Sequence, residues 1–280
     1  MESIASMLEA LPYRGDGSDR PAGLALPPGP MPRRVGTRPL KRWRYAGVYG
    51  PELMLCAGTV HVAGIPQTFW AVWDREGRRL WERTVLRRGR VELPDGAVRV
   101  ADREVSVDLV LESAGEPVEV VSRHGASYIW TRKSPIRATG LVTLEGRTLA
   151  VDARGLTDET AGYHARHTAW EWSAGTGIAT SGESVVWNLV AGVHDAPRHS
   201  ERTVWVDGAP SEVGPVAFAD GLDAVGDLRF SPEAERVRRD DLLLVASDYR
   251  QPFGTFAGRL PDGTELASGH GVMERHRARW

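Results

Sequence analysis

The chain has 280 residues, one cysteine, ten tryptophans, 31 glycines and a formal net charge of -2. Because its acidic and basic residues are interspersed, it lacks the sustained positive field of a nucleic-acid binder, and nucleic acid is not an expected partner. The single cysteine, Cys56, excludes an intramolecular disulfide framework and a cysteine-based zinc cluster.

The N-terminal residues 1–39 are predicted to form an arm. Residues 2–11 are expected to make a short amphipathic helix, and their acidic start is unlike a signal peptide. The stretch from residue 20 to residue 39 is rich in proline, which excludes regular helix and central strand. This arm either wraps the first domain or lies disordered. No apolar run approaches the roughly 20 residues of a membrane span, so we expect a cytoplasmic protein without a transmembrane segment.

From residue 41 onward, short apolar runs alternate with turns. Their spacing, roughly eight to twelve residues, is typical of a β-sandwich or β-barrel. Only residues 231–238 are expected to form a helical turn, with Ser231 as cap and Pro232 at the first position. Residues 127–131 and 136–144 are expected to form two separate strands. We predict an all-β protein of two consecutive antiparallel barrel-like units with little helix, covering residues 40–155 and 156–280.

Residues 162–175 hold the densest collection of reactive side chains. Two tryptophans, a threonine and glycines at both ends favour a β-strand there. Alternation along a strand places a polar row on one face, formed by Tyr163, His167 and Glu171. The other face carries His164, Trp170 and Trp172. We predict that the polar row looks into an enclosed hollow.

Other interpretations of this stretch remain open. As a helix, it would align His164, His167 and Glu171 at metal-ligand spacing, but residues three apart on a strand face opposite sides. We therefore expect no metal site and no cofactor. On the residues alone, local hydrogen bonds are favoured for the histidines, a surface or ion-paired position for Glu171, and core packing for Trp170 and Trp172.

Acid–base chemistry would need partners from other strands, because neighbours in the polar row lie roughly 13 Å apart. An acid enclosed by aromatic side chains has a raised pKa, which suits a proton donor. Aromatic faces would stabilise a cationic intermediate by about 2 kcal/mol. The candidate partners are Asn188, His194, Asp195, Glu52, Asp248 and Arg250.

Several separated motifs resemble a known family. They are RWRY at 42–45, PQTFW at 66–70, YHARHTxWxW at 163–172, WNL at 187–189, SDYRQPFG at 247–254 and GVMERH at 271–276. In this order they resemble the bacterial domain-of-unknown-function family 2804, from about residue 40 to the C-terminus. More distantly, the pattern is similar to the tandem lipocalin-like group of carotenoid hydratases and tocopherol cyclase. This resemblance implies two lipocalin-like (calycin-type) β-barrels that bind a long apolar molecule.

We therefore expect a protein that binds a hydrophobic small molecule in a β-barrel cavity and isomerises, hydrates or cyclises it. Glu171 or Asp248 is the expected proton donor, with His167 or His164 as its partner. The expected ligand contacts are Tyr163, Trp170, Trp172, Asn188, Trp187, Arg250 and Gln67. A non-catalytic lipid or metabolite carrier is the alternative, since it needs only apolar walls and one polar anchor. A structural β module with a filled interior is the third hypothesis.

Overall fold

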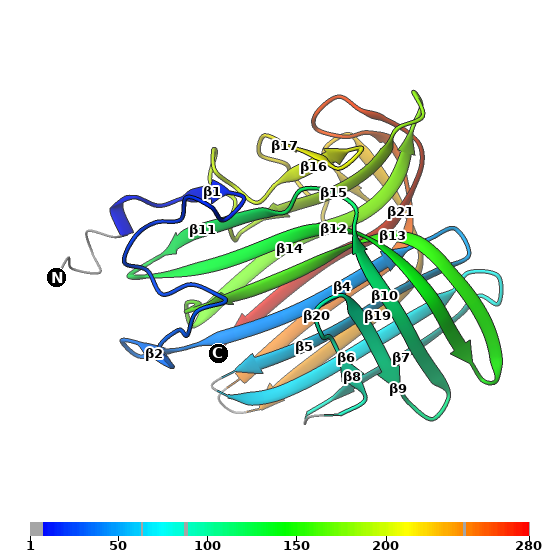
Figure 1. Ribbon diagram of the computed structural model, residues 1–280, viewed down its shortest axis with the longest axis horizontal. Helices are drawn as coiled ribbons and strands as arrows, with labels where there is room; N and C mark the ends of the chain where they lie inside the picture. Colours follow the sequence, from blue (N-terminus) through cyan, green and yellow to red (C-terminus); the bar gives the residue numbers. More distant parts are fainter. Residues whose placement is uncertain (1–7, 63, 87–88, 243–244, 280) are drawn as a thin grey trace.

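The computed structural model describes residues 8–62, 64–86, 89–242 and 245–279. Its strands form two large antiparallel sheets and one small two-stranded sheet. In Figure 1 the first large sheet is coloured from blue to green and the second from green through yellow to red, and the two lie against each other. Within the described ranges, no helix is long and apolar enough to cross a bilayer.

The first sheet is centred on its two longest strands, β12 (Ser127–Leu144) and β13 (Arg147–Gly162). Its other strands are β1 (Tyr13–Gly15), β4 (Lys41–Tyr49), β5 (Leu53–Val62), β6 (Ile65–Asp74), β7 (Arg79–Val85), β8 (Val91–Glu92), β9 (Ala97–Ala101), β10 (Val105–Ser113) and β11 (Val118–His124). The order is β7-β6-β5-β4-β13-β12-β10-β9-β8. In addition, β11 pairs with β12 on one side and with β1 on the other. The small sheet pairs β2 (Arg34–Val35) with β3 (Arg38–Pro39).

The second sheet follows the first in the chain. Its strands are β14 (His167–Ala179), β15 (Ser184–Ala191), β16 (Thr203–Val206), β17 (Ala209–Glu212), β18 (Ala224–Val225), β19 (Leu228–Leu242), β20 (Val245–Arg259) and β21 (Glu265–Arg279). The order is β17-β16-β15-β14-β21-β20-β19-β18. The prediction of an all-β protein with two consecutive lipocalin-like antiparallel units is confirmed.

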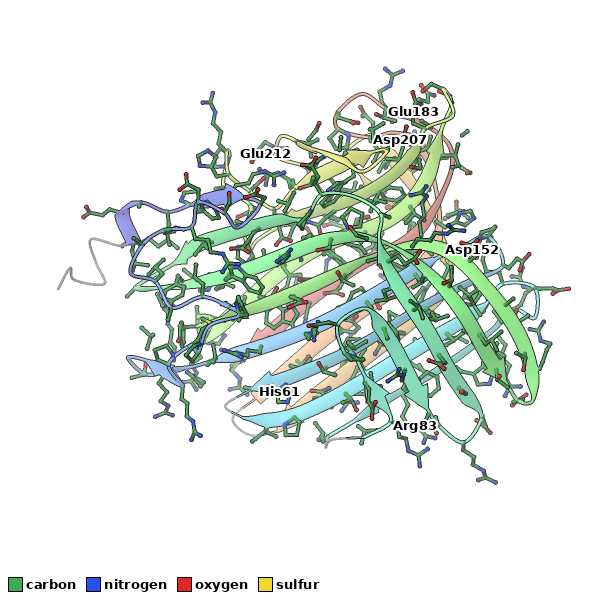
Figure 2. All side chains as sticks on the ribbon, viewed as in Figure 1. His61, Arg83, Asp152, Glu183, Asp207 and Glu212 are labelled. Atoms are coloured by element: carbon green, nitrogen blue, oxygen red, sulfur yellow. The ribbon has the colours of Figure 1, made fainter. Side chains whose placement is uncertain are left out.

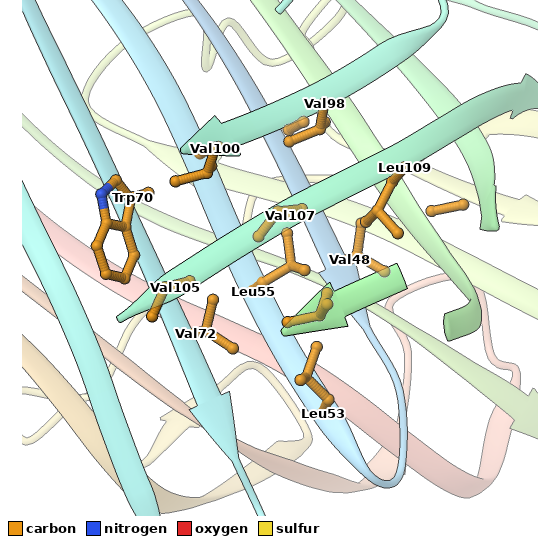
Figure 3. Close-up of a cluster of buried hydrophobic side chains, with 14 of the residues drawn as sticks. Val48, Leu53, Leu55, Trp70, Val72, Val98, Val100, Val105, Val107 and Leu109 are labelled. Atoms are coloured by element: carbon orange, nitrogen blue, oxygen red, sulfur yellow. The ribbon is translucent and has the colours of Figure 1, made fainter. Parts of the chain in front are cut away.

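Each large sheet curls around an apolar core of its own. In Figure 3, Val48 of β4 and Leu55 of β5 face two residues from the other end of the sheet. These are Val98 of β9 and Leu109 of β10. The second sheet encloses a comparable cluster that includes Trp187. A third cluster fills the space between the two sheets. Because apolar side chains fill both curls, the polar groups that could do chemistry lie elsewhere.

Two strands continue through positions where the sequence predicted a break. In both cases the proline lies where the strand changes its pairing partner or forms a bulge. β12 runs through Pro135, where its partner changes from β11 to β10, so the missing N–H interrupts no ladder. The predicted helical turn over residues 231–238 is wrong. These residues belong to β19, and a register shift between Pro232 and Ala234 accommodates the proline.

The N-terminal arm packs against the first sheet. Leu8, Leu26 and Met31 are buried in one cluster with aromatic side chains of β12, and Tyr13 pairs with Val121 of β11. Of the two alternatives for the arm, this contact corresponds to wrapping. The predicted helix of residues 2–11 falls largely outside the described residues, and only Leu8 and Glu9 of it are seen in helical conformation.

The chain passes from the first sheet to the second within residues 163–166, between the end of β13 and the start of β14. This crossing lies a few residues after the predicted unit boundary near residue 155. The boundaries at residues 39 and 155 stay predictions. The position of this crossing determines which side chains of residues 162–175 reach the space between the sheets.

Close approach of β13 to β4 depends on Gly155, and this generates a test of the fold. A Cβ added at Gly155 would lie 2.0 Å from the Gly47 carbonyl oxygen, whereas one at Gly214 would meet nothing within 4 Å. We expect Gly155→Ala to lower the free energy of unfolding by about 1–3 kcal/mol, because backbone must move apart. Urea unfolding measures this, with Gly214→Ala as the matched control. Equal stabilities for the two variants would contradict the close approach.

Candidate functional site

Most charged side chains project outward, as Arg83, Asp152 and Glu212 do in Figure 2, but a smaller group lies between the sheets. Because side chains alternate along a strand, one face of each sheet looks toward the other. Register places Asp158 between Tyr45 and Lys133 on the first sheet. On the second sheet, Trp172 stands directly opposite Glu274. The two inner faces thus bring ionisable and aromatic groups together.

Glu274 of β21 is the central acid of this space. Its side chain is buried and accepts three hydrogen bonds, from Trp170 Nε1 at 2.8 Å, the Tyr249 hydroxyl at 3.0 Å and Gln251 Nε2 at 3.0 Å. All three donors are neutral, so none of these bonds supplies a positive charge. Burial raises the pKa of Glu274 and outweighs the opposing effect of the bonds from Trp170 and Tyr249.

Arg236 of β19 supplies the positive charge behind this acid. Its side chain is 4% exposed, and its Nη1 donates to Gln251 Oε1 at 3.3 Å. The Nε atom donates to Glu82 Oε2 at 2.9 Å, and the guanidinium lies over the rings of Phe69 and Tyr249. By holding the Gln251 oxygen, Arg236 leaves the amide nitrogen directed at the carboxylate. We call Trp170, Arg236, Tyr249, Gln251 and Glu274 the acid cluster.

Aromatic side chains that are only half-buried border the acid cluster. The rings of Trp43 and Trp170 are stacked, with centroids 6.3 Å apart and planes inclined by 10°. His276 lies 4.3 Å from Trp170 and 5.2 Å from Tyr249 between ring centroids, and its Nε2 is 2.8 Å from the Ser247 hydroxyl oxygen. Burial lowers the pKa of His276 to about 4, so this imidazole is neutral at pH 7. These rings form a largely apolar border of the acid cluster.

A second buried group links the two sheets through charges. Lys133 Nζ lies 2.6 Å from Asp158 Oδ2 and 3.4 Å from Glu201 Oε1, and we call these three residues the ion triad. Asn188 Nδ2 donates to the Glu201 carbonyl oxygen at 2.9 Å, and Asn188 Oδ1 accepts from Trp172 Nε1 at 2.7 Å. Two carboxylates thus share one ammonium. Burial raises the pKa of Glu201 to about 7, and repulsion by Asp158 adds to this effect, whereas Lys133 opposes it.

The central stretch is not one strand, so its predicted polar row does not exist. Tyr163 lies before β14 and is buried under the N-terminal arm, where its hydroxyl donates to the Pro32 carbonyl oxygen at 2.7 Å. His167 is exposed at the first position of β14. The prediction that these residues face one enclosed hollow with Glu171 is wrong, because the chain changes sheets within the row.

Glu171 faces away from the acid cluster. Its Oε1 accepts from Arg275 Nε at 2.8 Å, and the two residues are directly opposite each other on β14 and β21. Of the surface and ion-paired positions that the sequence favours for Glu171, the structure shows the ion-paired one. Trp170 and Trp172, on the opposite face of β14, point between the sheets and hydrogen-bond to groups of the site.

Asp248 and Arg250 occupy the outer face of β20. Asp248 is paired with Arg239 at 3.3 Å and Arg250 with Glu235, and these ion pairs are solvent-exposed. The alternating residues Tyr249 and Gln251 point inward instead. The motif at 247–254 therefore does contribute to the site, but through the neighbours of the predicted residues.

The remaining predicted residues lie in several surroundings. Asn188 is buried next to the ion triad, whereas Trp187 is buried in the core of the second sheet and donates to the Ser173 hydroxyl at 3.1 Å. Gln67 is half-buried on β6. Of the candidate partners, His194 is buried and hydrogen-bonded to Ser122, while Glu52 and Asp195 are exposed.

His164 is buried beside Trp43, away from the exposed His167 and the ion-paired Glu171. These three residues therefore do not form the metal site that a helix would have aligned. Among the described residues, no group of three or more His, Cys, Asp or Glu side chains could hold a metal ion.

Sequence reasoning missed the residues that form most of this site. A signal for Tyr249 and Gln251 was present, because a strand with one wet face tends to direct Asp248 and Arg250 outward. Glu274 lies in the motif at 271–276, but its burial is not a local property. No local pattern marks Lys133, Asp158, Glu201 and Arg236, which come together only through the pairing of distant strands.

Comparison with known proteins identifies relatives of this architecture. The family described as "Domain of unknown function (DUF2804)" matches residues 90–280. A crystal structure of an AttH candidate from Nitrosomonas europaea is similar over 91% of this chain and 97% of its own, with 14% identity and a TM-score of 0.53. That of kievitone hydratase from Nectria haematococca matches over 84% and 88%, with 12% identity and a TM-score of 0.48. No curated protein matches the sequence significantly.

The ion triad generates a pH-dependent prediction. A carboxyl with a raised pKa binds its proton more tightly in the folded state, so its contribution to stability is complete below its ordinary value of 4.5 and is lost as the pH rises to about 7. Relative to Glu201→Gln, the free energy of unfolding of the wild type should fall by about 3 kcal/mol over this range. Denaturant unfolding at a series of pH values measures it.

The exposed Glu52 provides the control for this measurement, since Glu52→Gln should leave the pH profile of the wild type unchanged. Parallel profiles for the wild type and Glu201→Gln would mean that Glu201 is ionised in the folded state.

Proposed function

The chain belongs to the family described as a domain of unknown function (DUF2804). For this member we propose binding of an apolar small molecule between the two sheets, followed by acid–base chemistry on that molecule. Glu274 is the proton donor, in place of the Glu171 or Asp248 expected from sequence. The half-buried aromatic side chains Trp43, Trp170 and Tyr249 form the approach for the ligand.

One observation carries the proposal, namely a carboxyl buried among neutral donors. An exposed glutamate that forms an ion pair with an arginine is ionised at neutral pH, so it has no proton to donate. Burial raises the pKa of Glu274 and so extends the pH range in which it keeps its proton. The hydrogen bonds from Tyr249 and Gln251 hold the carboxyl in one orientation. These are the two properties that a general acid needs.

The charges around Glu274 favour one kind of substrate. A proton passes from the carboxyl to an unsaturated carbon of the ligand, and the carboxylate recovers a proton from solvent. Arg236, one residue removed behind Gln251, disfavours a full positive charge on the ligand. The enol form of a ketone conjugated to a double bond suits the site better than an isolated alkene, because protonation of its carbon leaves a protonated carbonyl group that loses its hydroxyl proton to solvent. Loss of a proton, addition of water or ring closure would complete isomerisation, hydration or cyclisation.

Binding requires movement of side chains at the aromatic approach. Tyr45, Tyr49 and Trp172 fill the space between the sheets. Open hollows of about 580 Å³ and about 290 Å³ lie elsewhere, and their walls are largely charged. The half-buried rings next to Glu274 are therefore the place where an apolar ligand would displace the least polar surface.

The role of Glu274 generates a test that applies equally to isomerisation, hydration and cyclisation. All three reactions place a solvent-derived proton on carbon, so in deuterium oxide the product carries deuterium. With a defined mixture of unsaturated fatty acids and conjugated isoprenoid ketones, Glu274→Gln should reduce labelling about a hundredfold or more, and Glu171→Gln should not. Mass spectrometry measures the labelling. Its rate should fall as the pH rises, because the raised pKa of Glu274 is then exceeded.

Equal labelling by the wild type and Glu274→Gln would remove Glu274 as the acid. If no compound in the mixture is labelled, native mass spectrometry of the purified protein distinguishes a non-catalytic carrier from a structural module.

We expect native mass spectra to show an apolar compound bound to the purified wild type, because the aromatic approach offers a poorly hydrated surface. Trp170→Ala should weaken its retention, since Trp170 contributes a face of the approach and a hydrogen bond to Glu274. Trp81→Ala, at a half-buried tryptophan of β7, is the matched control. A bound compound without labelling would indicate a carrier, and no bound compound would favour a structural module.

A further inference from the structure

A hollow of about 290 Å³ opens where the two edges of the first sheet approach each other. β7 is the strand at one edge of this sheet, and β8 is the strand at the other. Asp102, which follows β9, joins the two edges. Its Oδ1 accepts from Arg83 of β7 at 2.8 Å and from Arg90, just before β8, at 2.7 Å. Trp70, Arg83 and Asp102 line this hollow, and the function proposed for Glu274 makes no use of them.

Trp70 carries an indole N–H that lacks an acceptor. Its side chain is 5% exposed, and Nε1 has no hydrogen-bond partner among the described residues. In Figure 3, Trp70 lies at the margin of the first core, with its nitrogen on the side turned away from Val107 and Leu55. A buried indole N–H usually finds a partner, and leaving it unsatisfied destabilises the folded state. Trp70 therefore offers a hydrogen-bond donor at the hollow.

Asp102 offers the complementary acceptor. Its side chain is 2% exposed, and both arginines donate to the same oxygen, Oδ1. The other oxygen, Oδ2, is buried and has no donor among the described residues. Trp70 and Arg83 are directly opposite each other on β6 and β7, so the arginine that holds Oδ1 stands beside the unsatisfied indole. One unused donor and one unused acceptor thus belong to the same wall.

The charges around the hollow disfavour a charged ligand. The lining carries two arginines and three acidic residues, which are Arg79, Arg83, Glu82, Asp102 and Glu104. Several of these charges are already paired, since Arg79 donates to Glu145 and Glu82 accepts from Arg236. Because neither sign dominates, an anion and a cation would both gain little net attraction. A neutral ligand with its own donors and acceptors fits these walls better.

We propose that this hollow binds a neutral compound rich in hydroxyl groups, of the size of a single sugar ring. A hydroxyl group accepts one hydrogen bond while it donates another, so one group can receive the Trp70 N–H and donate to Asp102 Oδ2. Arg83 and Arg90 are long and half-exposed, so they can turn aside to admit it. The volume of about 290 Å³ lies at the small end of ligand sites, which suits one ring rather than a chain.

Titration of the ¹⁵N-labelled full chain with glucose tests the site. The readout is the indole ¹H–¹⁵N resonance of Trp70, assigned by its loss in Trp70→Phe. We expect a saturable shift of this resonance. The Trp187 resonance should not move, because its N–H already donates to Ser173 in the core of the second sheet. Sodium acetate at constant ionic strength is the anionic counterpart, and it should produce no saturable shift.

Asp102→Asn should weaken glucose binding by about tenfold or more, because it removes a charged acceptor. Asp108→Asn, at an exposed aspartate of β10, is the matched control and should bind glucose as the wild type does. Equal affinities of the two variants would overturn the role of Asp102.

Two results with the wild type would overturn the proposal, whether or not the Asp102 variant folds. Absence of a saturable Trp70 shift with glucose would mean that water alone satisfies the two atoms. A saturable shift with acetate but not with glucose would mean that the hollow selects an anion.

Discussion

The contact between the two sheets depends on a buried ionic group, in which Lys133 and Asp158 of the first sheet meet Glu201 from the connection between β15 and β16 of the second. Removing such charges from water costs several kcal/mol per ion, and their attraction offsets that cost only when the geometry is good. A displaced sheet would leave one of the carboxylates buried without its ammonium. The ion triad therefore restricts how the sheets meet. Through Asn188 and Trp172 it also connects to β15 and β14 of the second sheet.

This placement gives the neighbouring acid its character. Glu274 stands opposite Trp172 on the same inner face, and the first sheet covers both. Its hydrogen-bond donors carry no charge, whereas the only cation of the acid cluster, Arg236, reaches it through Gln251. The result is an oriented carboxyl with a raised pKa next to half-buried aromatic rings. A salt-bridged glutamate at the same depth would be oriented too, but it would be ionised.

Acidic and basic groups are separated along the space between the sheets. The acid cluster and the ion triad hold the carboxylates, while Lys41 and three histidines gather at the crossing between the sheets. Trp43 and Trp170 lie between Glu274 and His164.

The sequence by itself determined the all-β class and the placement of Trp170 and Trp172 on the strand face opposite Glu171, because turn spacing and strand alternation are local properties. It also pointed to the motif at 247–254, although Tyr249 and Gln251 rather than Asp248 and Arg250 face inward. Only the tertiary structure decided which acid is buried. Lys133, Glu201 and Glu274 are far apart in the chain, and their environment arises from strand pairing and sheet packing. Alternation assigns a residue to a face, but only packing between sheets decides whether that face meets water or another sheet.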